Sequence, residues 1–275
     1  MKGIENLLSI MKALRNPESG CPWDLKQDFK SVVAYTLEEA YEVQDAIERE
    51  AYGELKGELG DLLFQVVFHA RLAEEQGLFD FEAVANAISD KLTRRHPHVF
   101  APETIAKGLS EDEVNQRWEA GKALERDLQA VPGTRPGALA GIPEVLPALK
   151  RAQKLGARAA RVGFDWQGPD GPRAKIDEEL AEVAGEFAAA DRAPERLSAE
   201  CGDVLLSVVS YCRHLGVDAE QALSGANRRF QQRFELMEAL CEADDKALEG
   251  LEEALLEEYW EKAKAALRTG SSFRD

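Results

Sequence analysis

The stretch that decides the fold is Glu38-Glu39-Ala40-Tyr41-Glu42, followed by Glu58-Leu59-Gly60-Asp61-Leu62-Leu63. The same arrangement returns as Glu178-Glu179-Leu180-Ala181-Glu182 and Glu200-Cys201-Gly202-Asp203-Val204-Leu205. Positions i and i+3 of an α-helix lie on one face, so each copy directs carboxylates from two neighbouring helices toward a shared point. The repeat therefore predicts two related helical domains, each with its own acidic cluster.

Each acidic cluster is expected to hold a metal ion. Like charges gathered at one point are unfavourable unless something positive lies between them. Ligands that are all oxygen favour a hard cation, Mg²⁺ or Mn²⁺, over zinc. A solvated acidic helix face is the usual explanation of one such motif, but its repetition with the same neighbours favours metal binding. The expected ligands are Glu39, Glu42, Glu58 and Asp61 in the first copy and Glu179, Glu182, Glu200 and Asp203 in the second.

The rest of the chain indicates an all-α fold. Apolar residues recur at helical spacing almost throughout, and no strong alternation of period two appears. The expected helices cover residues 4–14, 31–50, 54–75, 81–95, 111–128, 146–161, 174–190, 195–215, 219–240 and 248–267. Glycines and prolines between the two halves predict a linker. We expect a tandem repeat of two helical bundles, at residues 1–130 and 146–268, with a linker at 131–145 and a tail at 269–275.

Composition limits the possible partners and location. The net charge of −17 argues against a duplex nucleic-acid partner, because phosphate contacts need a basic face. No apolar run approaches the length of a membrane span, so no membrane partner is expected. The first six residues lack signal-peptide character. The four cysteines form no CxxC pair and are expected to be reduced thiols, which is typical of a cytoplasmic protein.

Basic and aromatic residues follow the acids in both copies. Lys91 and Arg95 are spaced i, i+4, as are Arg229 and Arg233. Further along, a tryptophan precedes a lysine by four positions in each copy. These pairs are Trp118 with Lys122, and Trp260 with Lys264. Acids for metal ions, cations for outer phosphate oxygens and an indole for a flat base form a set that suits a nucleoside triphosphate. Packing in the core remains the alternative for both tryptophans.

Several longer motifs resemble the two-domain MazG proteins. In the first half they are the run from Leu14 to Asp24 containing Cys21-Pro22-Trp23-Asp24, then Tyr35 to Glu39, Gly57 to Phe68 and Arg94 to Phe100. In the second half they are Arg151 to Lys154, Val162 to Trp166 and Gly202-Asp203. The resemblance extends over about residues 4–268.

The resemblance implies an all-α nucleoside triphosphate pyrophosphohydrolase that needs Mg²⁺ and forms a homodimer. Such an enzyme cleaves NTP or dNTP to the monophosphate and pyrophosphate and serves nucleotide-pool house-cleaning. Two alternatives stay open. Related all-α folds hydrolyse dUTP or phosphoribosyl-ATP, and a chain with decayed sites would bind nucleotide as a regulator without turnover. The dimer is also expected because helices 58–73 and 200–215 are apolar on most faces.

The motif match also assigns roles to residues. In the second copy, it makes Glu179, Glu182, Glu200 and Asp203 the metal ligands of the catalytic site. It assigns nucleotide binding to Lys175, Arg229, Arg233, Trp260 and Lys264, with Arg229 standing where a lysine is common. Glu178, beside this set, either orients or deprotonates water or lies on the surface.

The second copy is expected to do most of the hydrolysis. Lys175 lies i, i+4 from Glu179 and shares its helix face, whereas the matching position in the first copy is the uncharged Tyr35.

Overall fold

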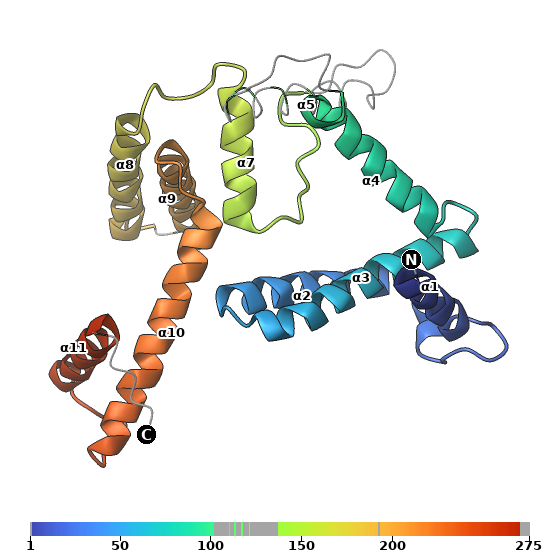
Figure 1. Ribbon diagram of the computed structural model, residues 1–275. Coiled ribbons are helices and arrows are strands. Elements are labelled where there is room, and N and C mark those ends of the chain that lie inside the picture. Colours follow the sequence, from blue (N-terminus) through green and yellow to red (C-terminus); the bar gives the residue numbers. More distant parts are fainter. Residues whose placement is uncertain are drawn as a thin grey trace. The chain divides into compact units, whose positions relative to one another are not determined.

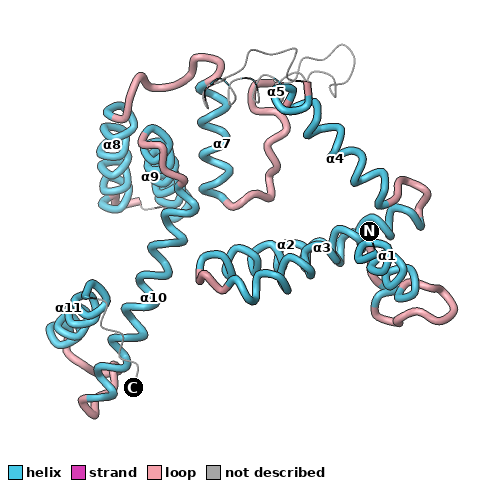
Figure 2. Tube along the Cα trace, viewed as in Figure 1, coloured by secondary structure: helices cyan, strands magenta, loops and turns pink. Residues whose placement is uncertain are grey.

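The computed structural model describes residues 2–101, 110, 113, 117, 121, 137–191 and 193–269. All regular structure in these residues is helical (Figure 2), which confirms the all-α prediction. Contacts divide the chain into two compact units, residues 1–123 and 124–275, and each unit holds one copy of the acidic repeat. The proposed limits of the domains, linker and tail stay predictions, since much of 102–136 and nearly all of 269–275 lie outside the described residues.

The first unit contains helices α1 (Lys2–Leu14), α2 (Phe29–Glu48), α3 (Tyr52–Glu75), α4 (Phe81–Arg95) and α5 (Pro97–Phe100), with a 3-10 helix η1 (Asp24–Lys26) before α2 (Figure 1). Helices α2 and α3 pair along their length, and α1 packs on α3. The buried centre is formed by Met11, Val32, Val67 and Phe68, one or more from each of these three helices. The acidic repeat therefore lies on the α2–α3 pair.

The second unit contains α7 (Ala148–Ala160), α8 (Asp170–Ala188), α9 (Pro194–His214), α10 (Ala219–Ala243) and α11 (Glu253–Thr269). Helices α8 and α9 form the pair that corresponds to α2 and α3, and α7 packs on α9 and α10. Figure 1 shows α10 leading away from this group, with α11 packed near its far end. A separate core of Met237, Cys241, Tyr259 and Ala263 joins α10 to α11.

Both ligand-bearing helices α3 and α9 end in the same way. After α3, Gly77 adopts φ +68°, and the N–H of Leu78 donates to the carbonyl of Ala73 at 3.0 Å. After α9, Gly216 adopts φ +71°, and the N–H of Val217 donates to the carbonyl of Cys212 at 2.9 Å. This bonding is the Schellman motif, in which glycine accepts the left-handed conformation at little cost.

Some helix limits differ from the sequence prediction. Helix α8 begins at Asp170 rather than at 174, because Pro172 lies in its first turn, where no N–H is needed. Helix α11 begins at Glu253 rather than at 248, after Gly250 with φ +85°. Helix α4 ends at Arg95 as predicted, but the short α5 follows directly. The helix expected at 111–128 lies largely outside the described residues.

The apolar stretch 62–68 is buried only in part. Val67 and Phe68 are buried, but Leu63 is 37% and Val66 is 39% exposed. The two exposed side chains lie one turn apart and extend an apolar stripe that includes Leu59. One face of α3 is thus left uncovered by the described residues of this unit.

Among the described residues, none of the helices combines the length and the apolar character that crossing a bilayer requires.

Candidate metal and nucleotide site

The first unit brings three predicted ligands together. One carboxylate oxygen each from Glu39 on α2 and from Glu58 and Asp61 on α3 lie within 4.8 Å of one another. Burial, followed by the negative charges of Asp61 and Glu42, raises the pKa of Glu39. The pKa of Glu58 is raised by burial and then by Glu42 and Asp61. Glu42 therefore belongs electrostatically to the same cluster.

The second unit repeats this geometry. Glu179 and Glu182 on α8 and Glu200 on α9 each place one carboxylate oxygen within 4.8 Å of the others. Glu179 is only 5% exposed. The negative charge of Glu179, followed by burial, raises the pKa of Glu182. Asp203, one turn after Glu200 on α9, lines the same cavity as Glu179.

Both clusters have the donor chemistry of a site for a hard divalent cation. Their ligand atoms are all carboxylate oxygens, and the carboxylates repel one another, as the raised pKa values of Glu39, Glu58 and Glu182 show. A cation between the oxygens would remove that repulsion. Each cluster could therefore hold a metal ion.

Lys175 distinguishes the second cluster from the first. Its Nζ lies 2.8 Å from Glu178 and 2.8 Å from Glu179, so the lysine and the acids share one face of α8. The hydrogen bonds that Lys175 donates to these two acids raise its pKa, which keeps the ammonium charged. At the matching position of the first unit, Tyr35 packs edge-to-face on Trp23 with ring centroids 5.7 Å apart. Only the second cluster thus has an ammonium group at this position.

The remaining predicted nucleotide contacts of the second copy lie on α10 and α11. Arg229 is exposed and Arg233 half-buried. Trp260 is half-buried, and its ring lies 5.4 Å from that of Phe230 against the α10–α11 core. Lys264 pairs with Glu261 at 2.5 Å. None of these four residues belongs to the acidic cluster or to the lining of the cavity beside it, as the described residues of the second unit show.

The first copy gives a similar result for its cations. Lys91 and Arg95 are half-buried near the end of α4, which leads away from the α2–α3 pair within this unit (Figure 1). Trp118 and Lys122 lie outside the described residues. The base-stacking and phosphate roles of these four residues stay predictions.

The repeated glycines Gly60 and Gly202 do not mark a close contact within the protomer. A Cβ at either position would meet no atom of the described residues within 4 Å. Glycine inside a helix often allows close approach of another helix, and the described helices of this protomer do not supply such a neighbour. The open space beside each glycine would therefore be filled by a ligand or by a second copy of the chain.

The sequence reasoning assigned no role to a cluster beside the second site. Asp165, in the loop between α7 and α8, accepts hydrogen bonds from Arg213 at 2.9 and 2.5 Å and lies 3.0 Å from Nε2 of His214. The repeated sequence could have indicated one member of this cluster: Arg213 and Arg71 are at matching positions, separated by the same interval as Asp203 and Asp61. In the first unit Arg71 instead pairs with glutamates of its own helix, at 2.8 and 2.9 Å.

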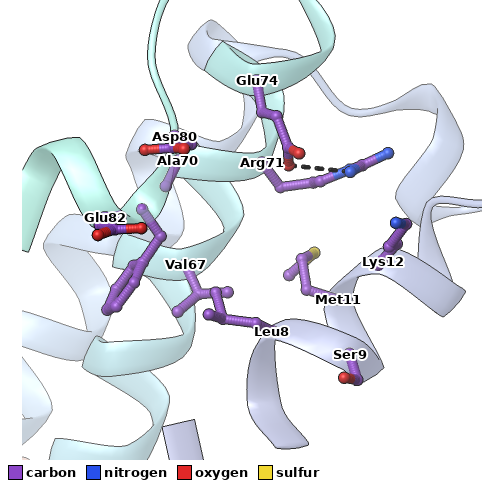
Figure 3. A pocket seen from close by; sticks show the side chains of 11 residues that line it. Leu8, Ser9, Met11, Lys12, Val67, Ala70, Arg71, Glu74, Asp80 and Glu82 are labelled. Atoms are coloured by element: carbon purple, nitrogen blue, oxygen red, sulfur yellow. Dashed lines mark hydrogen bonds and ion pairs between the residues drawn. The ribbon is translucent and has the colours of Figure 1, made fainter. Parts of the chain in front are cut away.

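Cavities also differ between the two units. In the first, a cavity of about 300 Å³ lies between α1, α3 and the start of α4, lined by Leu8, Met11 and Val67 (Figure 3). It contains none of the clustered ligands. In the second, a cavity of about 440 Å³ is lined by Lys175, Glu179 and Asp203 together with residues of α7, α9 and the loop that carries Asp165. Only the second cavity reaches an acidic cluster.

Comparison with known proteins agrees with the repeated architecture. The family model for the MazG nucleotide pyrophosphohydrolase domain matches twice, at residues 27–100 and 167–238. The chain is 48% identical over 264 residues to the nucleoside triphosphate pyrophosphohydrolase of Escherichia coli K12, covering 96% of this chain and 98% of that protein. It is 43% identical over 266 residues to the nucleoside triphosphate pyrophosphohydrolase/pyrophosphatase MazG of Thermotoga maritima, covering 97% of each.

Proposed function

Because this chain belongs to the MazG family, we propose that it hydrolyses nucleoside triphosphates to the monophosphate and pyrophosphate, mainly at its second acidic cluster. One observation carries the choice of site. Glu179, Glu182 and Glu200 converge within 4.8 Å, and Lys175 and a cavity of about 440 Å³ adjoin them. Metal ligands, a phosphate-binding cation and space for the nucleoside thus occur together in the second unit.

The chemistry of each side chain indicates its role in the reaction. Glu179, Glu182, Glu200 and Asp203 hold Mg²⁺, with Mn²⁺ as a substitute, as oxygen-only ligands do. When bound, the ion screens the phosphate charge and lowers the pKa of a coordinated water. Lys175 exchanges its contact with Glu179 for a phosphate oxygen. Glu178, exposed and hydrogen-bonded to Lys175 at 2.8 Å, would also be released once the ammonium has moved to the phosphate, and would then accept the proton of the attacking water.

The first cluster binds metal in the same way through Glu39, Glu42, Glu58 and Asp61 but contributes less turnover. It has no counterpart of Lys175, because Tyr35 occupies the matching position. A transition state with developing negative charge is stabilised by nearby positive groups, and their absence slows the reaction.

We further propose that the functional form is a homodimer. Exposed apolar side chains line both ligand-bearing pairs, among them Leu59 and Leu63 on α3 and Leu205 and Leu206 on α9. Exposed stripes of this kind are typical of surfaces that another chain covers. A second copy would also allow Arg229, Arg233, Trp260 and Lys264 to reach the acids of the partner protomer.

The cellular role that fits this chemistry is nucleotide-pool house-cleaning in the cytoplasm. All four cysteines are free thiols, as expected in a reducing compartment. The surface charge of −17 disfavours duplex nucleic acid as a partner. Narrower hydrolysis of dUTP or phosphoribosyl-ATP, and nucleotide binding without turnover, are the rival functions that a substrate panel separates.

The deciding experiment incubates the protein with the common NTPs and dNTPs, dUTP and phosphoribosyl-ATP, with Mg²⁺, with Mn²⁺ or with EDTA. We expect monophosphate and pyrophosphate from several NTPs and dNTPs, and no turnover in EDTA. Orthophosphate as the first product, or activity restored by zinc alone, would refute the proposal. Turnover of a single nucleotide would favour the narrower enzymes.

A further inference from the structure

The second glutamate of each EE pair, Glu39 in the first cluster and Glu179 in the second, has a different hydrogen-bond donor. In the first unit, Glu39 bonds to the side-chain amide of Gln65, a residue of α3 that is only 6% exposed. In the second unit, Glu179 pairs with the ammonium group of Lys175 at 2.8 Å. One donor is neutral and the other carries a full positive charge.

The two donors do not replace one another at a single position of the repeat. Gln65 matches Ser207, at the interval that also separates Asp61 from Asp203. The side chain of Ser207 is much shorter than that of glutamine, and it lines the cavity of the second unit. Lys175 matches Tyr35, which packs on an aromatic ring. Each copy thus has one of the two donors and lacks the other.

The charge around the acids differs accordingly. In the described part of the chain, no lysine or arginine forms an ion pair with any of the four acids of the first cluster, and Arg49 at the end of α2 pairs with Asp45 and Glu54 instead. In the second cluster the ammonium of Lys175 reaches beyond its direct partner. The negative charge of Glu179 and burial raise the pKa of Glu182, and Lys175 opposes that rise.

A metal ion would therefore meet different competition in the two clusters. A carboxylate that accepts one N–H from an amide keeps free lone pairs for an ion, and such a hydrogen bond fixes its orientation. At the second cluster, an ion must take Glu179 from Lys175 or lie beside its ammonium, and like charges repel. A second contact at 2.8 Å, to Glu178, holds this ammonium in place. A triphosphate offers the ammonium another anionic partner and carries an ion of its own.

These observations lead to an order of metal binding, which rests on the function proposed above. We propose that the first cluster is the site for a free divalent cation, held before the substrate arrives, and that the second cluster takes its ion together with the triphosphate. Gln65 and Lys175 are the residues that set this order. Gln65 is a positioning residue for Glu39, and Lys175 is the competitor that the phosphates remove. The acids of the first copy would then serve mainly to join α2 to α3 through an ion.

The test titrates the full chain with Mn²⁺ in the absence of nucleotide and measures the free ion by electron paramagnetic resonance. We expect one tight site per protomer and a second site that is about tenfold weaker. Glu58→Gln with Asp61→Asn should remove the tight site, whereas Glu200→Gln with Asp203→Asn should remove the weak one. Equal affinities, or loss of the tight site in the second double variant, would overturn the proposal.

Substituting the two donors tests the cause of the order. Lys175→Met should tighten the second site about tenfold and leave the first unchanged. Gln65→Met should weaken the first site about tenfold, the usual cost of losing a hydrogen bond that orients a metal ligand. Arg173→Met is the matched control, because it removes the same charge from α8, and Arg173 pairs with Asp177 outside the cluster. This control should change neither site.

A nucleotide that cannot be cleaved between its α and β phosphorus atoms completes the test. In the variant with Glu58→Gln and Asp61→Asn, α,β-methylene-ATP should tighten Mn²⁺ binding beyond that of the nucleotide alone, and adding Lys175→Met should reduce this gain. A silent Lys175→Met in both titrations would refute the role of the lysine. Lys175 is half-exposed, so this variant stays informative if a double variant does not fold. Because no step needs turnover, hydrolysis and the order of metal binding can fail separately.

Discussion

The two acidic clusters share their ligands but differ in their surroundings. In the first, carboxylates on α2 and α3 face one another with an aromatic pair, Trp23 and Tyr35, where a cation would be useful. In the second, Lys175 bonds to the buried Glu179, and a cavity leads away from the cluster. If the second cluster does most of the hydrolysis, as proposed above, a repeated set of acids does not by itself make a catalytic site, because the charge of the phosphates must also be accommodated.

The largest change in activity is expected when carboxylates are removed from one copy at a time. Glu200→Gln with Asp203→Asn should lower kcat/KM for ATP by at least about a hundredfold, since electrostatic stabilisation at the second site is lost. Glu58→Gln with Asp61→Asn should leave much of the activity. Steady-state pyrophosphate release measures both. The reverse order would assign catalysis to the first unit, and equal losses would indicate coupling between the units.

Metal binding should be visible as thermal stabilisation. A ligand at about a hundred times its Kd stabilises the folded state by about 2.7 kcal/mol. Mg²⁺ should raise the melting temperature in calorimetry, and each double variant should lose part of that rise. The rise should be smaller at pH 5 than at pH 7.5, because the raised pKa values of Glu39, Glu58 and Glu182 make protons compete with the ion. An equal rise at both pH values would contradict the carboxylate assignment.

The ion pair of Asp165 predicts acid sensitivity confined to the second unit. Hydrogen bonds from Arg213 lower the pKa of Asp165 to about 2, so its stabilising effect is complete above its ordinary pKa of 3.8 and is lost as the pH falls through about 2. Because Asp165 is exposed, screening by solvent reduces this loss to about 1 kcal/mol or less. Asp165→Asn should flatten the dependence of unfolding free energy on pH between about 4 and 2. An unchanged slope would show that the pair contributes little.

The smallest change in activity is expected from substituting Lys175 or Tyr35, the matched residues that distinguish the two clusters. Lys175→Met should lower kcat/KM about tenfold, because a half-exposed ammonium stabilises a charged transition state only modestly. Tyr35→Lys should raise the residual activity of a protein carrying Glu200→Gln and Asp203→Asn. Pyrophosphate release is again the measurement. If Lys175→Met is silent, the difference between the copies lies in the cavity alone.

Much of this arrangement could be predicted from the sequence, and the limits have physical causes. The helix period and the repeated Glu58-x-x-Asp61 spacing predicted that acids of neighbouring helices converge, because i, i+3 neighbours depend on local geometry alone; Glu58 and Asp61 do join Glu39, and Glu200 joins Glu179 and Glu182. The cluster of Asp165, Arg213 and His214 depends on contacts across 48 and 49 residues, which no local period encodes. The exposure of Leu63 and Val66 reflects which partners a helix finds and not its own pattern.

The isolated packing of α11 on α10 has a consequence for the order of folding. Its core joins Cys241 and Tyr259, which are close in sequence, and the hydroxyl of Tyr259 donates a hydrogen bond to Asp244 across only 15 positions. The cavity needs pairings across 48 to 68 positions, from Arg213 to Asp165 and from Lys150 to Asp218. Since short loops close at less entropic cost, we expect the α10–α11 hairpin to form early and the cavity to be completed late. Hydrogen exchange during refolding should therefore protect the amides of the hairpin before those around the nucleoside cavity.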